Sequence, residues 1–276
     1  MLKDLIAIVD NAEAAAGFIG QALGFAAAHD AHLAVTLLTP DYTSLTALPP
    51  YAGYPLLHDQ VTERQAHELE AIRRLTEGAP VPVEVRGISD ATAYLFGASR
   101  IEGRYADLLL IGATASFEDD KLRARLIETA VMSSGGPVLV LPEGAQLARI
   151  GHAVVGWDAS GEARRAVRDL MDVIEPGAHI DIVTVDAEES RTGHGQSPGS
   201  NIARYLARHG YEVEVHPQRT SDGQRVSGAL ESFARNRGAD LLAIGAFAHS
   251  RVRDILLGGV TRELLAEVRL PLLLSR

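Results

Sequence analysis

The chain has 276 residues, of which 46% are hydrophobic and 22% charged, and it contains no cysteine. This composition predicts a well-cored protein of about two ordinary domains and excludes disulfides, thiolate metal sites and cysteine nucleophiles. The net charge of −10 argues against nucleic-acid and membrane-surface binding, and no apolar run reaches the roughly 18 residues that a membrane span needs, so we expect a cytoplasmic protein.

Apolar runs and helical periodicity alternate along the whole chain. The runs predict strands, and the periodic segments between them predict helices. The expected strands are Asp4–Val9, Leu33–Leu38, Val83–Arg86, Asp107–Ile111, Val138–Leu141, His152–Trp157, Ile180–Val185, Val213–His216, Asp240–Ile244 and Leu272–Leu274. The expected helices are Glu13–His29, Leu57–Thr76, Ala91–Glu102, Phe117–Ser133, Glu162–Ile174, Asn201–His209, Gln224–Asn236 and Arg251–Glu267. Such alternation is typical of an α/β fold with doubly wound parallel sheets.

The second half of the chain repeats the first. Residues 107–112 read DLLLIG and residues 240–245 read DLLAIG, while Asp10 and Asp158 each follow an apolar strand. Two copies of one fold explain these matches, with a first domain at residues 1–146 and a second at 147–276.

The last crossover of the second copy carries the most informative residues. Gly245 ends a predicted strand, and Gly258 and Gly259 stand where a helix begins. Glycine costs about 1 kcal/mol inside a helix, so two together indicate either a close approach to the backbone or a helix start. A helix start presents unpaired N–H groups and a partial positive charge, which suit a phosphate.

The spacing of these residues resembles the nucleotide-binding signature of the universal stress protein family. That signature has Gly, two residues, Gly, nine residues, Gly, and then Ser or Thr. Gly245 and Gly258 match its first and third glycines, whereas Ala248 replaces the second glycine and Gly259 the hydroxyl residue. The resemblance implies two tandem five-stranded sheets of order 3-2-1-4-5 and a site for ATP or AMP, possibly with Mg²⁺. It also implies pairing through the last strand of each sheet, here as an intrachain pseudo-dimer, with a further homodimer possible.

The predicted site lies at the carboxyl ends of the strands of the second copy, where the strand order reverses. Asp158 would accept hydrogen bonds from the nucleotide, Val185 would flank the base, and the glycine-rich helix start would hold phosphates. The predicted binding residues are Asp158, Ala159, Val185, Ile244, Gly245, Ala248, His249, Gly258, Gly259, Val260 and Thr261.

Simpler interpretations remain open for these residues. Asp158 could merely cap the next helix, although Ser160 could do that alone. The glycine pair could serve close helix–sheet packing, Val185 could belong to the core, and His249 could lie on a solvated surface. In the first copy, Ala124 and Arg125 replace the glycine pair, so we expect that domain to be a structural partner.

The sequence favours a nucleotide-binding protein that is not an enzyme, or at most hydrolyses slowly, and that acts in the stress response. We identify no catalytic residue and no metal site, and an acidic helix start explains residues 118–120 better than a divalent ion does. The alternative is a nucleotide-free interaction or scaffold protein of the same fold. A third possibility is a small hydrolase of nucleotides or phosphoesters.

Overall fold

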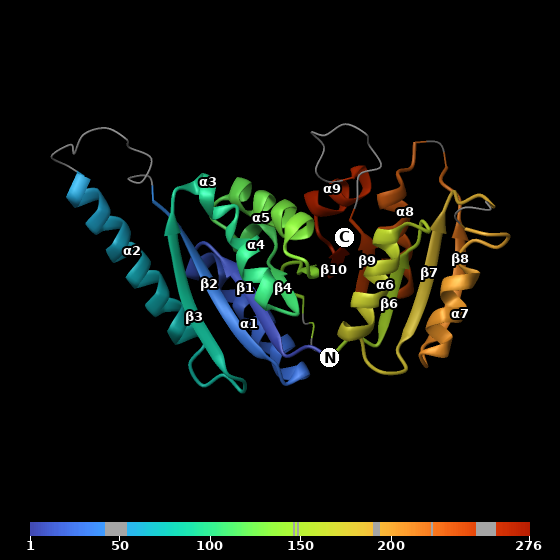
Figure 1. Ribbon diagram of the computed structural model, residues 1–276, viewed down its shortest axis with the longest axis horizontal. Coiled ribbons are helices and arrows are strands. Elements are labelled where there is room, and N and C mark those ends of the chain that lie inside the picture. The colour runs from blue at the N-terminus through green and yellow to red at the C-terminus, as the bar shows by residue number, and fades with distance from the viewer. Residues whose placement is uncertain (42–53, 146, 148, 190–193, 222, 247–257) are drawn as a thin grey trace. The chain divides into compact units, whose positions relative to one another are not determined.

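The computed structural model describes residues 1–41, 54–145, 147, 149–189, 194–221, 223–246 and 258–276. The chain divides into two compact units, Leu2–Ala148 and Arg149–Arg276, with Met1 grouped with the second. Each unit is an α/β domain in which helices flank five strands (Figure 1). No helix among the described ranges is long and apolar enough to cross a membrane.

The N-terminal unit contains five parallel strands in the order β3-β2-β1-β4-β5. The strands are β1 (Asp4–Val9), β2 (His32–Pro40), β3 (Val83–Asp90), β4 (Leu108–Ile111) and β5 (Val138–Val140). The helices are α1 (Ala12–His29), α2 (Tyr54–Leu75), α3 (Thr92–Leu95), α4 (Ala98–Glu102) and α5 (Asp120–Ser133), with short 3₁₀ segments η2 (Gly103–Tyr105) and η3 (Thr114–Ser116).

The C-terminal unit repeats this topology, with its parallel strands in the order β10-β9-β6-β7-β8. The strands are β6 (His152–Gly156), β7 (His179–Val185), β8 (Glu212–Gln218), β9 (Leu241–Gly245) and β10 (Leu272–Ser275). The helices are α6 (Gly161–Val173), α7 (Ser200–Arg208), α8 (Val226–Arg237) and α9 (Gly259–Ala266). The predicted order 3-2-1-4-5 is therefore confirmed in both units.

Burial along the strands follows their place in the sheet. The central strands β1, β4, β6 and β9 are continuous apolar runs that are almost wholly buried, because helices cover both faces of a parallel sheet. The outer strands β3 and β8 instead alternate between exposed and half-buried residues. This alternation is what allows β8 to carry polar side chains such as Glu214 and His216.

In each unit, one carboxylate accepts hydrogen bonds from backbone N–H groups at the start of the first strand. Asp107 accepts hydrogen bonds from the backbone N–H groups of Lys3 and Asp4, at 2.6 and 3.0 Å. Asp240 accepts the equivalent pair from Gly151 and His152, at 3.0 and 2.9 Å. The two copies therefore share a local contact as well as a topology.

The structure corrects two predicted helices and leaves a third partly untested. The single helix expected at Ala91–Glu102 is two short helices, α3 and α4, because the low helix propensity of Gly97 falls between them. The helix expected from Phe117 begins at Asp120, because Asp119 caps it by accepting hydrogen bonds from Lys121 N and Leu122 N. The helix expected at Arg251–Glu267 is observed from Gly259 to Ala266, and residues 251–257 lie outside the described ranges.

Candidate ligand-binding site

A cavity of about 290 Å³ opens at the carboxyl ends of the central strands of the C-terminal unit. It lies beyond the ends of β6, β7 and β9, and the starts of α8 and α9 complete its wall. Its volume is near the lower end of small-molecule pockets, which hold roughly 300–1,000 Å³. The lining residues are Gly156, Trp157, Asp158, Val183, Val185, Val226, Leu230, Ile244, Gly245, Gly258, Gly259, Val260 and Thr261.

Gly245 is required at the end of β9 by the close approach of another backbone. A Cβ added there would lie 2.4 Å from Ala163 N and 2.6 Å from the carbonyl carbon of Glu162, both in the first turn of α6. No side chain fits between the strand and the helix. Gly245 therefore sets how closely the start of α6, and with it the segment that carries Asp158, approaches the cavity.

The start of α9 contributes backbone rather than side chains to the cavity. Gly258 is the N-cap, with φ −63° and ψ 158°, and no side chain caps this helix. A Cβ added at Gly259 would have nothing within 4 Å, so the space beside that residue is open. Helix geometry leaves the N–H groups of Gly259, Val260 and Thr261 without acceptors inside the helix. An anion in the cavity could accept hydrogen bonds from these groups.

Asp158 is not needed as the cap of α6. Ser160 Oγ accepts the capping hydrogen bond from Ala163 N at 3.0 Å, and Asp158 Oδ1 accepts one from Ser160 N at 3.0 Å. Between them, Ala159 has φ +61°, in the left-handed region that costs a non-glycine residue about 1–2 kcal/mol. In the N-terminal unit Asn11 directly follows Asp10 and caps α1, so Ala159 is the additional residue in this turn.

The structure brings most of the predicted site residues to one cavity. Asp158, Val185, Ile244, Gly245, Gly258, Gly259, Val260 and Thr261 all line it. Ala159 occupies the turn beside Asp158 without lining the cavity, and Ala248 and His249 lie outside the described residues.

Sequence reasoning missed five residues that line the cavity. Gly156, Trp157 and Val183 belong to strand ends already predicted there, so their positions could have indicated them. Val226 and Leu230 come from α8, and no local signal marks the face of a helix that meets a distant strand end.

Comparison with known proteins relates the C-terminal unit to a known family. Residues 150–276 match the model of the universal stress protein family. A universal stress protein of Synechocystis sp. is 27% identical over 172 residues, which cover 60% of this chain and 55% of that protein. The crystal structure of a universal stress protein from Archaeoglobus fulgidus, 16% identical, covers 99% of this chain and 96% of its own, with a TM-score of 0.70. A functionally unknown Pseudomonas aeruginosa PAO1 protein, 14% identical, covers 99% of this chain and 92% of its own, with a TM-score of 0.55. The C-terminal unit therefore belongs to the universal stress protein family.

The family match and the structural likeness cover different parts of the chain. The family model covers the C-terminal unit, whereas the likeness to the Archaeoglobus protein extends the fold over both units. The match to the Synechocystis universal stress protein spans about half of that protein's length.

The two units differ at the position that Asp10 and Asp158 share. Asp10 is buried, and its carboxylate accepts hydrogen bonds from the backbone N–H groups of Glu118 and Asp119, at 2.9 Å each. Burial raises the pKa of Asp10, and these two hydrogen bonds oppose the rise. In the N-terminal unit a carboxylate of the chain itself therefore takes the backbone donors before α5 that an anionic ligand could otherwise use.

The other residues near α5 also have local roles. Glu118 forms an ion pair with Arg64 at 2.6 Å, and Asp119 is the N-cap of α5. Arg125, which stands opposite Gly259 in the repeat, lies inside α5 and pairs with Glu128 at 2.9 Å on the helix surface. The acidic start of α5 is thus accounted for by a cap and an ion pair.

Proposed function

We propose that the C-terminal unit binds an adenine nucleotide, ATP or AMP, in the cavity between the ends of β6, β7 and β9 and the start of α9. The observation that carries this proposal is that a carboxylate and an uncapped helix N-terminus line the same cavity. A carboxylate, Asp158, is supplied by the end of the first strand of the unit, and an open helix start is supplied by Gly258 and Gly259.

The chemistry of the lining suits the three parts of a nucleotide. Apolar side chains, among them Val185 and Ile244, offer a dry surface for a base. Asp158 can accept hydrogen bonds from ribose hydroxyls or an exocyclic amine. The N–H groups of Gly259 and Val260 at the start of α9 can donate hydrogen bonds to phosphates, and the partial positive charge of the helix end favours these anions.

Binding rather than turnover is the function that this lining supports. Asp158 is the one ionisable side chain among the described residues that line the cavity. Its Oδ1 accepts a hydrogen bond from Ser160 N, and among the described lining residues no second acid or base accompanies it to assist attack by water. We therefore propose a nucleotide-binding protein of the stress response that hydrolyses ATP slowly or not at all.

The decisive variant is Gly259→Glu. The open space at Gly259 admits the new side chain without a backbone clash, and its carboxylate would stand where phosphates are expected. Like charges in contact cost several kcal/mol, so we expect affinity to fall by more than about 100-fold, or ~2.7 kcal/mol. Gly20→Glu is the matched control, because it adds the same charge at an exposed position of α1 in the other unit with nothing within 4 Å.

Each protein would be titrated calorimetrically with ATP, AMP and ADP, with and without Mg²⁺. Trp157 is the single tryptophan of the chain and lines the cavity, so its fluorescence gives a second reading. One saturable site that Gly259→Glu loses and Gly20→Glu keeps supports the proposal. No binding of any nucleotide at millimolar concentration supports a nucleotide-free interaction protein instead. Phosphate release that disappears in Gly259→Glu would establish a hydrolase.

A further inference from the structure

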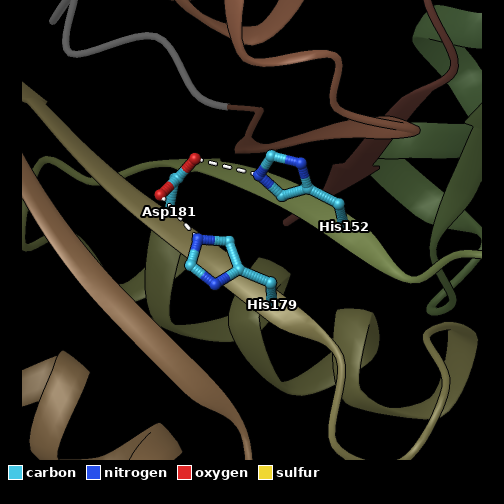
Figure 2. Close-up of side chains that lie close together, drawn as sticks. All are labelled: His152, His179 and Asp181. Carbon is cyan, nitrogen blue, oxygen red and sulfur yellow. Dashed lines mark hydrogen bonds and ion pairs between the residues drawn. The ribbon is translucent and has the colours of Figure 1, made fainter.

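Three histidines of the C-terminal unit surround one buried carboxylate, at the opposite end of the strands from the ligand cavity. His152 is the first residue of β6, His179 is the first residue of β7, and His216 lies in the outer strand β8. Each points its Nε2 atom at Asp181, at 2.9, 3.0 and 2.9 Å respectively. Figure 2 shows His152 and His179 approaching this carboxylate from two different strands.

Strand register explains why these side chains meet. His152 lies directly beside His179 in the parallel pair of β6 and β7, and Asp181 lies beside Glu214 of β8. Residues two apart on a strand share a face, so His179 and Asp181 point the same way.

The geometry of His152, His179 and Asp181 fits a metal ion. The two Nε2 atoms and a carboxylate oxygen all lie within 4.8 Å of one another. Zinc binds imidazole nitrogen and carboxylate oxygen at about 2.0–2.2 Å, which separates tetrahedral ligand atoms by roughly 3.3 Å. His152 Nε2 lies 2.9 Å from Oδ2 of Asp181, and His179 Nε2 lies 3.0 Å from Oδ1, so each separation is a few tenths of an ångström shorter and the two imidazoles face different oxygens of one carboxylate. Small rotations of the two imidazoles would therefore admit an ion.

Burial and access also suit a metal site. Asp181 is fully buried, whereas the side chains of His152 and His179 are 21% and 27% exposed, which leaves an ion a path from solvent.

Arg237, the last residue of α8, influences how tightly the site would bind a divalent ion. Its guanidinium donates to both oxygens of Asp181, from Nε at 2.9 Å and from an Nη at 3.2 Å, and also contacts Glu214 at 3.0 Å. Its positive charge also repels a divalent ion, and it lets Asp181 stay buried and ionised without one.

We propose that His152, His179 and Asp181 form a binding site for a divalent transition-metal ion, with Zn²⁺ as the probe ion. Two imidazoles and one carboxylate make three protein ligands, and this number leaves a fourth position for water or an outside ligand. Because Arg237 satisfies the carboxylate in the absence of metal, the ion binds to a folded unit and is not required for folding. The affinity is accordingly lower than that of structural zinc sites, in which binding drives folding.

The N-terminal unit provides an internal contrast. In the equivalent strand pair, Asp4 stands beside His32 as His152 stands beside His179. Two residues further along β2, the position of Asp181 is taken by Ala34, which cannot bind a metal. His32 is therefore a matched control: a histidine at the same place in the same fold, without the central carboxylate.

The test uses the full-length protein stripped of metal with a chelator and then dialysed. Zn²⁺ is titrated in competition with a chromophoric chelator, and Co²⁺ is added separately because its visible spectrum reports coordination by protein nitrogen and oxygen. We expect one equivalent of Zn²⁺ to bind to the wild type and to His32→Gln. The double variant His152→Gln/His179→Gln should weaken binding by more than about 100-fold, because it removes two ligands rather than an outer partner worth 10–100-fold.

Arg237→Gln distinguishes a metal site from a purely structural ion pair. Removing the cation should strengthen Zn²⁺ binding by about tenfold or more while lowering the thermal stability of the metal-free protein. A Zn²⁺ affinity that is unchanged or weaker in Arg237→Gln would contradict the role given to that residue and to Asp181 as a ligand.

Three results would overturn the proposal. They are the absence of one saturable equivalent of Zn²⁺ in the wild type, full binding in the double variant, and loss of binding on His216→Gln with His152 and His179 intact. Circular dichroism shows whether the double variant is folded. Should it unfold, the wild-type Co²⁺ spectrum decides: bands of a low-coordinate nitrogen-bound ion support the site, and the spectrum of aqueous Co²⁺ refutes it.

Discussion

Replacing Gly245 by alanine should destabilise the C-terminal unit severely, although only one methyl group is added. The new Cβ would stand 2.4 Å from Ala163 N and 2.6 Å from the Glu162 carbonyl carbon, where ordinary contacts exceed about 3.4 Å. Both atoms belong to the backbone, so no rotamer change relieves the overlap. Either β9 or the first turn of α6 must move by about 1 Å. Overpacking typically costs 1–3 kcal/mol, and we expect ~3 kcal/mol or more here because backbone must move.

Urea denaturation followed by tryptophan fluorescence measures the loss of stability of the C-terminal unit in Gly245→Ala. Trp157 is the single tryptophan of the chain and lies next to the affected segment, so the signal reports the C-terminal unit. With a slope of about 2 kcal/mol per molar urea, a loss of ~3 kcal/mol lowers the midpoint by about 1.5 M. The variant should also bind nucleotide more weakly, since the displaced turn carries Asp158.

The control is Gly228→Ala in α8. A Cβ there would meet nothing within 4 Å, and alanine is favoured over glycine inside a helix, so we expect the midpoint to stay or rise by the equivalent of roughly 0.5–1 kcal/mol. Should Gly245→Ala shift the midpoint no more than Gly228→Ala does, the close approach of α6 to β9 would not be the reason for glycine at this position.

Two further substitutions test the strand-end aspartates and their surroundings. Ala159→Gly should stabilise the C-terminal unit by about 1 kcal/mol, because glycine adopts the φ of +61° without strain; an unchanged or lower urea midpoint would contradict this. Asp10→Asn should destabilise the N-terminal unit by about 1–3 kcal/mol at neutral pH, because the amide cannot accept from both Glu118 N and Asp119 N. The raised pKa of Asp10 means that the folded state holds its proton more tightly than the unfolded chain, so wild-type stability falls as pH rises from 3.8 through that pKa. The advantage of the wild type over Asp10→Asn, measured by urea denaturation and far-ultraviolet circular dichroism, should therefore be larger near pH 4 than at pH 7, and an equal or smaller advantage would refute the assigned burial.

The sequence by itself determined the α/β class, the strands and the repeat, because these signals are local, whereas the strand order came from the family resemblance. A parallel strand covered on both faces must be a run of apolar residues, as Leu108–Ile111 and Leu241–Leu242 are, and the same runs recur in the second half. The Gly258–Gly259 pair indicated either a close backbone approach or a helix start, and the structure shows that α9 begins at Gly259. The helix predicted at Ala91–Glu102 is interrupted at Gly97, because the low helix propensity of glycine is not offset by the few helix-forming residues on either side.

Only the tertiary structure decided what the strand-end residues do. Asp10 and Asp158 follow equivalent strands, yet Asp10 is tied to the backbone before α5 while Asp158 lines a cavity. The reason for Gly245 is a helix more than 80 residues earlier in the chain. The convergence of His152 and His179 on Asp181 depends on which strands are neighbours and in which register. Sequence pattern marks a strand and its buried face, but register is set by packing between distant segments, and so contacts across strands could be known only from the folded chain.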